Sequence, residues 1–103
     1  MGLPNRLHYV TTKAGAIGLT RSLAREVGDW NICVNAMAPG SIGTEIQRDS
    51  SGPAHEQDMI QQRCLKRPAV PEDLIGTLLY LSSEASDFIT GQVINIDGGL
   101  YHY

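Results

Sequence analysis

Residues 31–38, with the sequence NICVNAMA, are the stretch that most clearly indicates the fold of this chain. Apolar and polar side chains do not alternate cleanly along it, which is typical of a strand covered on both faces. Strands of this kind belong to parallel sheets that carry helices on each side. Pro39-Gly40 follows directly and predicts the end of the strand, because both residues favour turns.

The residues before this strand predict a long helix over 9–27. Small and apolar side chains cover most of its circumference in the first half, which indicates packing on more than one side. Gly15 and Gly18 lower the helix propensity, so we expect another backbone to approach closely at these positions. Gly28 is expected to end the helix in a left-handed conformation.

The residues after the strand are irregular over 41–70, with a short helix expected at about 55–64. Pro71 predicts the first turn of a further helix that ends near Ser83. A second buried strand is expected at 93–96. This order indicates an α/β fold in which the helix that starts at Pro71 is a right-handed crossover between parallel strands. Two strands cannot make a stable doubly wound sheet alone, so the sheet is predicted to be incomplete.

Composition narrows the classes of partner and site. The 103 residues carry a formal net charge of -3 and no basic run, which argues against nucleic acid and anionic membranes as partners. No apolar stretch could cross a bilayer and no signal peptide is visible, which leaves a cytoplasmic location as the expectation. Cys33 and Cys64 are expected to be thiols, with Cys33 in the core. His8, His55 and His102 lack metal-ligand spacing, so no metal site is predicted.

Tyr9 and Lys13 are four residues apart and therefore share one face of the predicted helix. A free phenol has a pKa of about 10 and is a poor base at neutral pH. A nearby ammonium favours the phenolate, and a tyrosine tuned in this way can exchange a proton with a carbonyl or an alcohol. On spacing alone the pair is more often a coincidence of two surface residues.

The context of the pair changes that balance. Residues 9–15 (YVTTKAG) and 34–40 (VNAMAPG) resemble the Tyr-x-x-x-Lys segment of the short-chain dehydrogenase/reductase family and the strand and turn that follow it. Residues 67–73 resemble the segment before the penultimate helix of that family, and 90–99 resemble its last strand. The motifs keep the order of the family from about Gly2 to Gly99, and this order is far more specific than any one motif.

The resemblance implies a role for each matching residue. Tyr9 would act as the general acid or base, and Lys13 would hydrogen-bond the nicotinamide ribose and favour the ionised phenol. The residues that would hold the nicotinamide end of NAD or NADP are Tyr9, Lys13, Pro39, Gly40, Ile42 and Thr44. Ligands in open α/β sheets bind beyond the carboxyl ends of the strands, where Pro39-Gly40 is expected. The irregular segment 41–66 would then be the substrate loop.

Structural explanations remain open for several of these residues. Pro39-Gly40 could be only a turn, and without its neighbours this reading is about as good as the functional one. Asn35 and Asp97 could simply satisfy backbone groups at the strand ends. The segment that begins at Asp97 is expected to be structural whatever the function.

The parts of the family pattern that are absent also matter. No glycine-rich phosphate turn follows a strand, and the catalytic serine of the family would lie upstream of Tyr9 by more residues than this chain has there. Residues 1–103 would thus be the C-terminal part of a single Rossmann-like dehydrogenase/reductase domain, truncated at the N-terminus. Neither NAD nor NADP is expected to bind tightly to the chain alone, and we expect it to be inactive.

The resemblance leaves the function of the chain with two explanations. One is the catalytic end of an NAD(P)-dependent oxidoreductase that moves a hydride between nicotinamide and a carbonyl or secondary alcohol. The other is a non-catalytic remnant or interaction module. The chain resembles sugar-alcohol dehydrogenases and 3-oxoacyl carrier-protein reductases about equally. The expected partners are a small alcohol or ketone and, for the complete protein, further copies of itself in a dimer or tetramer.

Overall fold

The computed structural model describes residues 5–43 and 53–100. Four-residue strands and longer helices make up its regular structure. The elements, in order, are α1 (Leu7–Val27), the 3-10 turn η1 (Gly28–Trp30), β1 (Ala36–Pro39), α2 (Pro53–Gln62), α3 (Glu72–Leu81), the 3-10 turn η2 (Glu84–Ser86) and β2 (Val93–Ile96).

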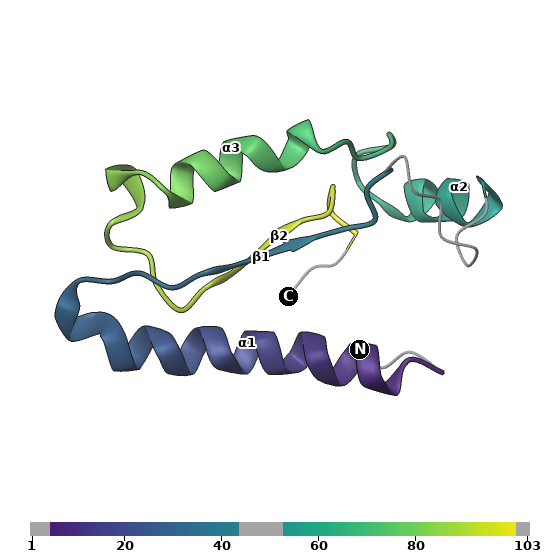
Figure 1. Ribbon diagram of the computed structural model, residues 1–103. Coiled ribbons are helices and arrows are strands. Elements are labelled where there is room, and N and C mark those ends of the chain that lie inside the picture. The colour runs from purple at the N-terminus through teal and green to yellow at the C-terminus, as the bar shows by residue number, and fades with distance from the viewer. Residues whose placement is uncertain (1–4, 44–52, 101–103) are drawn as a thin grey trace.

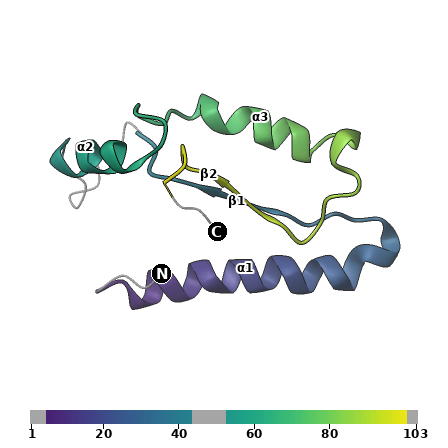
Figure 2. The same cartoon turned by 180° about the vertical axis from the view of Figure 1, so that it is seen from behind.

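The sheet consists of β1 and β2, which pair in parallel from Ala36 opposite Val93 to Pro39 opposite Ile96. Helix α1 lies along one face of the two strands and α3 lies along the other (Figure 1). The view from behind shows the same three layers (Figure 2). The expected α/β fold with helices on both faces of a parallel sheet is therefore confirmed, and α3 is the connection between the two strands.

The end of the first helix differs from the prediction at Gly28. Helix α1 begins two residues before the predicted start and ends at Val27 as expected, but Gly28 is right-handed, with φ of -59°. The chain continues as η1, and the left-handed residue is Asn31, with φ of 57°. The 3-10 turn delays the reversal by three residues, and asparagine tolerates this conformation better than most side chains.

The first strand is shorter than predicted and starts at Ala36. The residues before it are held by a loop instead: the Val34 amide donates to Thr90 Oγ1 at 3.0 Å, and Asn35 donates to the Ile89 carbonyl at 2.8 Å. Asn35 Oδ1 also accepts from the Gln92 amide, so its structural role is confirmed. Cys33 lies outside the sheet and is exposed, so its expected place in the core is wrong.

The remaining elements lie close to their predicted positions. Helix α2 spans Pro53–Gln62, about two residues earlier than expected, and α3 begins directly after Pro71. Strand β2 has the predicted bounds. The carboxylate of Asp97 accepts from the amides of Gly99 and Leu100 at the end of this strand, as its structural reading predicts.

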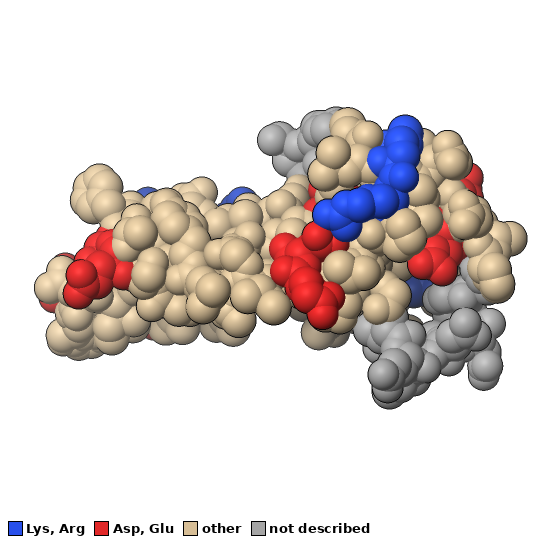
Figure 3. Space-filling model, turned by 90° about the horizontal axis from the view of Figure 1, so that it is seen from above, with Lys and Arg blue, Asp and Glu red and all other residues tan. Residues whose placement is uncertain are grey.

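Few apolar side chains are buried in the part of the chain that the structure describes: only Ala24 and Ile60. No neighbouring atom comes within 4 Å of a Cβ placed on Gly15 or Gly18, so the close approach expected there is not made by the described residues. The face that carries α3 shows a broad stretch without charged side chains (Figure 3). Exposed apolar residues of α3 are Ile75, Leu78, Leu79 and Tyr80.

No helix in residues 5–43 or 53–100 combines the length and apolar character that crossing a membrane requires. Within the same ranges, no group of three His, Cys, Asp or Glu side chains gathers closely enough to hold a metal ion. Cys33 and Cys64 do not form a disulfide.

Candidate active site

Tyr9 and Lys13 lie on the first two turns of α1, and the fold brings their side chains together. The Lys13 Nζ atom is 5.5 Å from the centroid of the Tyr9 ring, within the range of a cation–π contact. Their spacing of four residues places them one helical turn apart on the same face. Tyr9 is 41% exposed, so the phenol is accessible from outside the chain.

The direction of α1 determines at which end of the sheet this pair lies. Helix α1 runs antiparallel to the strands, so its N-terminal turns and the carboxyl end of β1 lie at the same end of the molecule (Figure 1). The view from behind agrees (Figure 2). Tyr9 and Lys13 therefore lie at the end of the sheet where Pro39 and Gly40 end the first strand.

Gly40 fits tightly against the end of β2. Its amide donates to the Ile96 carbonyl at 3.0 Å, which extends the strand pairing by one residue. A Cβ at this position would lie 3.0 Å from both Cα and Cβ of Asp97. The turn after β1 is therefore packed directly on the residue that follows β2.

The next residues are braced by a different segment. Ile42 forms an isolated parallel bridge with Ala69, and the Gly43 amide donates to the Ala69 carbonyl at 3.2 Å. The structure thus places Pro39 at the end of β1 and Gly40 and Ile42 in the segment that follows it. Thr44, the remaining predicted member of the nicotinamide site, lies outside the described residues.

Arg63, which the sequence analysis did not single out, is buried beneath this turn with 3% of its surface exposed. Its Nη2 atom donates to the Ser41 carbonyl at 2.5 Å and Nη1 donates to the Arg67 carbonyl at 3.2 Å. An arginine directly after an amphipathic helix is usually exposed. No local pattern in the sequence signals that this one is enclosed.

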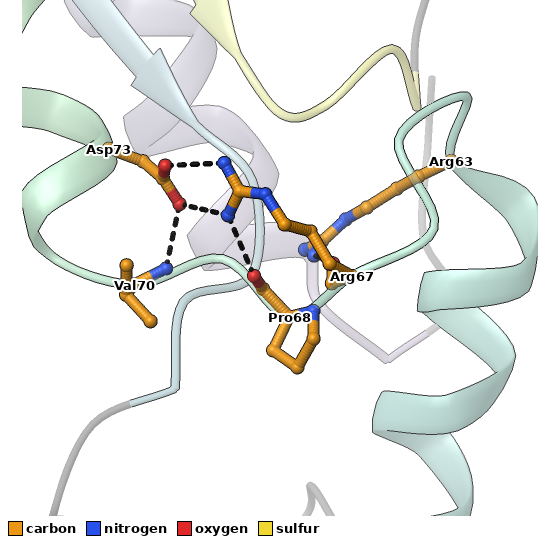
Figure 4. A network of polar contacts seen from close by, with 5 residues as sticks. All are labelled: Arg63, Arg67, Pro68, Val70 and Asp73. Atoms are coloured by element: carbon orange, nitrogen blue, oxygen red, sulfur yellow. Dashed lines mark hydrogen bonds and ion pairs between the residues drawn. The ribbon is translucent and has the colours of Figure 1, made fainter.

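Arg67 and Asp73 form a two-pronged ion pair at the start of α3 (Figure 4). The two guanidinium nitrogens of Arg67 donate to the Asp73 carboxylate at 2.7 and 2.6 Å, and the Val70 amide donates to the same carboxylate at 2.9 Å. The bonds from Arg67 and then from Val70 hold the pKa of Asp73 well below its usual range. The pair also raises the pKa of Arg67.

A hollow of about 220 Å³ lies beside this ion pair. Its lining residues are Arg63, Leu65, Arg67, Ala69, Asp73, Ile96 and Gly98. None of the predicted site residues is among them. Ile96 and Ala69, which do line it, bond to the turn at Gly40 and Gly43.

Comparison with known proteins identifies the family of the chain. The family model described as Enoyl-(Acyl carrier protein) reductase matches residues 1–101. The 3-oxoacyl-(acyl-carrier-protein) reductase FabG of Staphylococcus epidermidis is 43% identical over 101 residues, which are 98% of this chain and 41% of that protein. An uncharacterized oxidoreductase of Mycobacterium tuberculosis is 45% identical over 91 residues, 88% of this chain and 37% of the relative.

Solved structures agree with the sequence relatives. A 4-hydroxyisoleucine dehydrogenase complexed with NADH superposes with a TM-score of 0.86 at 38% identity, covering 97% of this chain and 42% of that one. A 3-oxoacyl-(acyl-carrier protein) reductase from Brucella melitensis with bound NAD gives 0.83 at 37% identity, covering 94% and 34%. The chain belongs to the short-chain dehydrogenase/reductase family of oxidoreductases. It spans about two-fifths of the length of the curated relatives it matches.

Proposed function

We propose that residues 1–103 are part of one Rossmann-like domain and supply the proton-transfer pair and the nicotinamide-facing turn of an NAD(P)-dependent oxidoreductase. The observation that carries this proposal is the contact between the Lys13 ammonium and the Tyr9 ring, at the carboxyl end of a parallel sheet. Open α/β sheets bind their ligands at that end.

The proposed chemistry converts a carbonyl to a secondary alcohol, or the reverse. When bound, the reduced nicotinamide supplies the hydride that adds to the carbonyl carbon. Tyr9 donates the phenolic proton to the carbonyl oxygen, so that hydride and proton together make CH–OH and leave the phenolate and the oxidised cofactor. Lys13, whose Nζ lies 5.5 Å from the centroid of the Tyr9 ring, would place a positive charge near the phenolate that forms in this step.

The residues available for the cofactor fit its nicotinamide end. Lys13 would donate to the ribose, and Pro39, Gly40, Ile42 and Thr44 would line the ring. The structural support is the braced turn, in which Gly40 is held by Ile96 and Gly43 by Ala69. This chain carries no glycine-rich phosphate turn, so we propose that it is inactive alone and binds neither NAD nor NADP tightly.

The names of two relatives indicate the class of substrate. The names of the relatives describe reduction of a 3-oxoacyl group and dehydrogenation of 4-hydroxyisoleucine. Both involve a ketone and its secondary alcohol, which is the reaction that Tyr9 is proposed to serve. We therefore propose a small alcohol or ketone as the substrate.

The test uses a chimera in which this chain replaces the 101-residue stretch that it matches in the Staphylococcus epidermidis reductase. Tyr9→Phe removes only the phenolic oxygen, so turnover of a 3-oxoacyl thioester should fall by about 10²- to 10⁴-fold. The affinity for NADH and NADPH, measured by fluorescence titration, should change little because the ring and Lys13 remain.

The control is Tyr80→Phe on α3, because Tyr80 is also a helical tyrosine with 41% of its surface exposed. This variant should keep the turnover of the parent chimera. Retained turnover in Tyr9→Phe, in a chimera that is itself active, would reject the role given to Tyr9.

A further inference from the structure

Arg63 is a buried cation, although few side chains are buried in the part of the chain that the structure describes. A side chain enclosed in this way needs a structural reason. An enclosed guanidinium is costly unless its donors are bonded. Nη1 and Nη2 are bonded to two backbone carbonyls, while Nε has no hydrogen-bond partner among the described residues. Both terminal nitrogens of Arg63 thus donate to backbone carbonyls.

One of the two carbonyls belongs to the turn that would form the nicotinamide wall, and the other belongs to the segment that braces this turn. Ser41 directly follows Gly40, and Arg67 lies two residues before Ala69. The same two segments meet again at the bridge between Ile42 and Ala69. Arg63 therefore holds the turn at Ser41 by a hydrogen bond, while the backbone bridge to Ala69 holds it at Ile42.

The Arg63 side chain also lies against the residues that follow β1 and β2. Its Cδ atom lies 3.4 Å from where a Cβ on Gly98 would be, and its Nη2 lies 3.6 Å from the corresponding position on Gly40. The side chain thus fills the space between the ends of β1 and β2 and the loop after α2. Its removal would leave the Ser41 carbonyl without this donor and open space beneath the turn.

We infer that Arg63 is a positioning residue that holds the Gly40–Ile42 turn, and through it the nicotinamide wall, in place. This inference rests on the proposed function for the role of the turn. It differs from a general contribution to stability, because the guanidinium bonds, among the described contacts, to the backbone of the turn and of the segment that braces it. Its loss should loosen residues 41–43 and leave the distant end of the sheet intact.

The test compares Arg63→Met, which keeps bulk without a donor, with Arg63→Lys, which restores one donor. In the chimera, Arg63→Met should speed hydrogen exchange of the Gly43 amide by about tenfold. The amide of Ala36, which donates to Gln92 at the other end of β1, should be unaffected. The Kd for NADH should rise by about tenfold, and Arg63→Lys should give intermediate values for both.

The control is Lys66→Met, which removes a positive charge from the same loop. Lys66 is exposed and donates only to the Gln61 carbonyl among the described contacts, so this variant should match the parent in both measurements. Unchanged exchange at Gly43, or equal acceleration at Gly43 and Ala36, would overturn the inference. If Arg63→Met does not fold, Arg63→Lys is judged by the same two criteria.

The exchange measurement also separates this inference from the proposed function. If Tyr9→Phe retains turnover, the proposed function fails whatever happens at Gly43. If Tyr9→Phe loses turnover and Gly43 exchange is unchanged in both Arg63 variants, only the positioning role is wrong.

Discussion

Single residues in the proposed site are constrained by contacts with segments far away in the sequence. Gly40 is the clearest case, since it packs on Asp97 and its amide is bonded to Ile96. The φ of Gly40 is not in the left-handed region. Glycine is therefore needed here because a side chain would not fit, and not because the backbone conformation requires it. Gly28 is the opposite case, because nothing lies within 4 Å of its Cβ position.

Gly40→Ala should therefore displace the turn in the chimera. The new methyl group would lie 3.0 Å from the Asp97 backbone, which must shift to admit it. Overpacking of this kind costs about 1–3 kcal/mol, which urea unfolding would measure, and NADH affinity should fall with it. Gly28→Ala is the control and should lower neither quantity, because alanine fits this right-handed, open position. Equal behaviour of the two variants would show that Gly40 is not tightly packed.

At the scale of the element, the start of α3 is held by the ion pair between Arg67 and Asp73. The Asp73 carboxylate lies in the first turn of the helix, where negative charge is favourable, and also accepts from the Val70 amide. The pair is exposed to solvent, so its contribution should be small and should weaken with salt. It links the loop that carries Ala69, the partner of Ile42, to α3.

Asp73→Asn should lower the stability of the chimera slightly at neutral pH. Asparagine can still accept from Val70 but cannot form the ion pair with Arg67. Because folding lowers the pKa of Asp73, its contribution is complete above the unfolded pKa of about 4 and is lost as the pH falls toward the folded pKa. Urea midpoints of the parent and the variant should thus differ at pH 7 and converge in acid.

The matched variant is Arg67→Gln, which removes the other member of the pair. It should shift the neutral-pH midpoint in the same direction, and the double variant should add little to either change. A gap between parent and Asp73→Asn that widens on acidification would contradict the assigned direction.

At the scale of the whole molecule, the described fold buries too little to resemble a compact domain. The chain exposes 8116 Å², whereas a compact protein of its mass exposes about 5,700 Å². Its radius of gyration is 15.6 Å, against about 13 Å for a compact chain of this length. Part of this surface comes from exposed apolar side chains on both outer helices, such as Leu19 and Leu79.

The isolated chain should therefore bind a hydrophobic fluorescent dye and unfold gradually in urea. Both effects have the same cause, since only Ala24 and Ile60 form a buried apolar core in the described part of the chain. The chimera, in which further protein surrounds these faces, should bind little dye and unfold in one cooperative step. A steep urea transition of the isolated chain without dye binding would show that it folds stably on its own.

The features that the sequence predicted correctly depend on neighbours along the chain. Periodicity indicated α1 and α3, and the non-alternating apolar run indicated a strand with helices on both faces. The spacing of Tyr9 and Lys13 was enough to place them on one helical face, because helical geometry is the same wherever the helix lies. The turn propensity of Pro39-Gly40 predicted the end of the first strand.

What required the folded chain depends on which distant segments meet. Strand β1 starts only at Ala36 because its pairing with β2 begins at Val93, and the chain reverses at Asn31 because η1 intervenes. The burial of Arg63 arises where two loops and the ends of both strands converge on one side chain. Local propensity cannot predict this burial. Each of these segments would have the same sequence pattern if the others lay elsewhere in the fold.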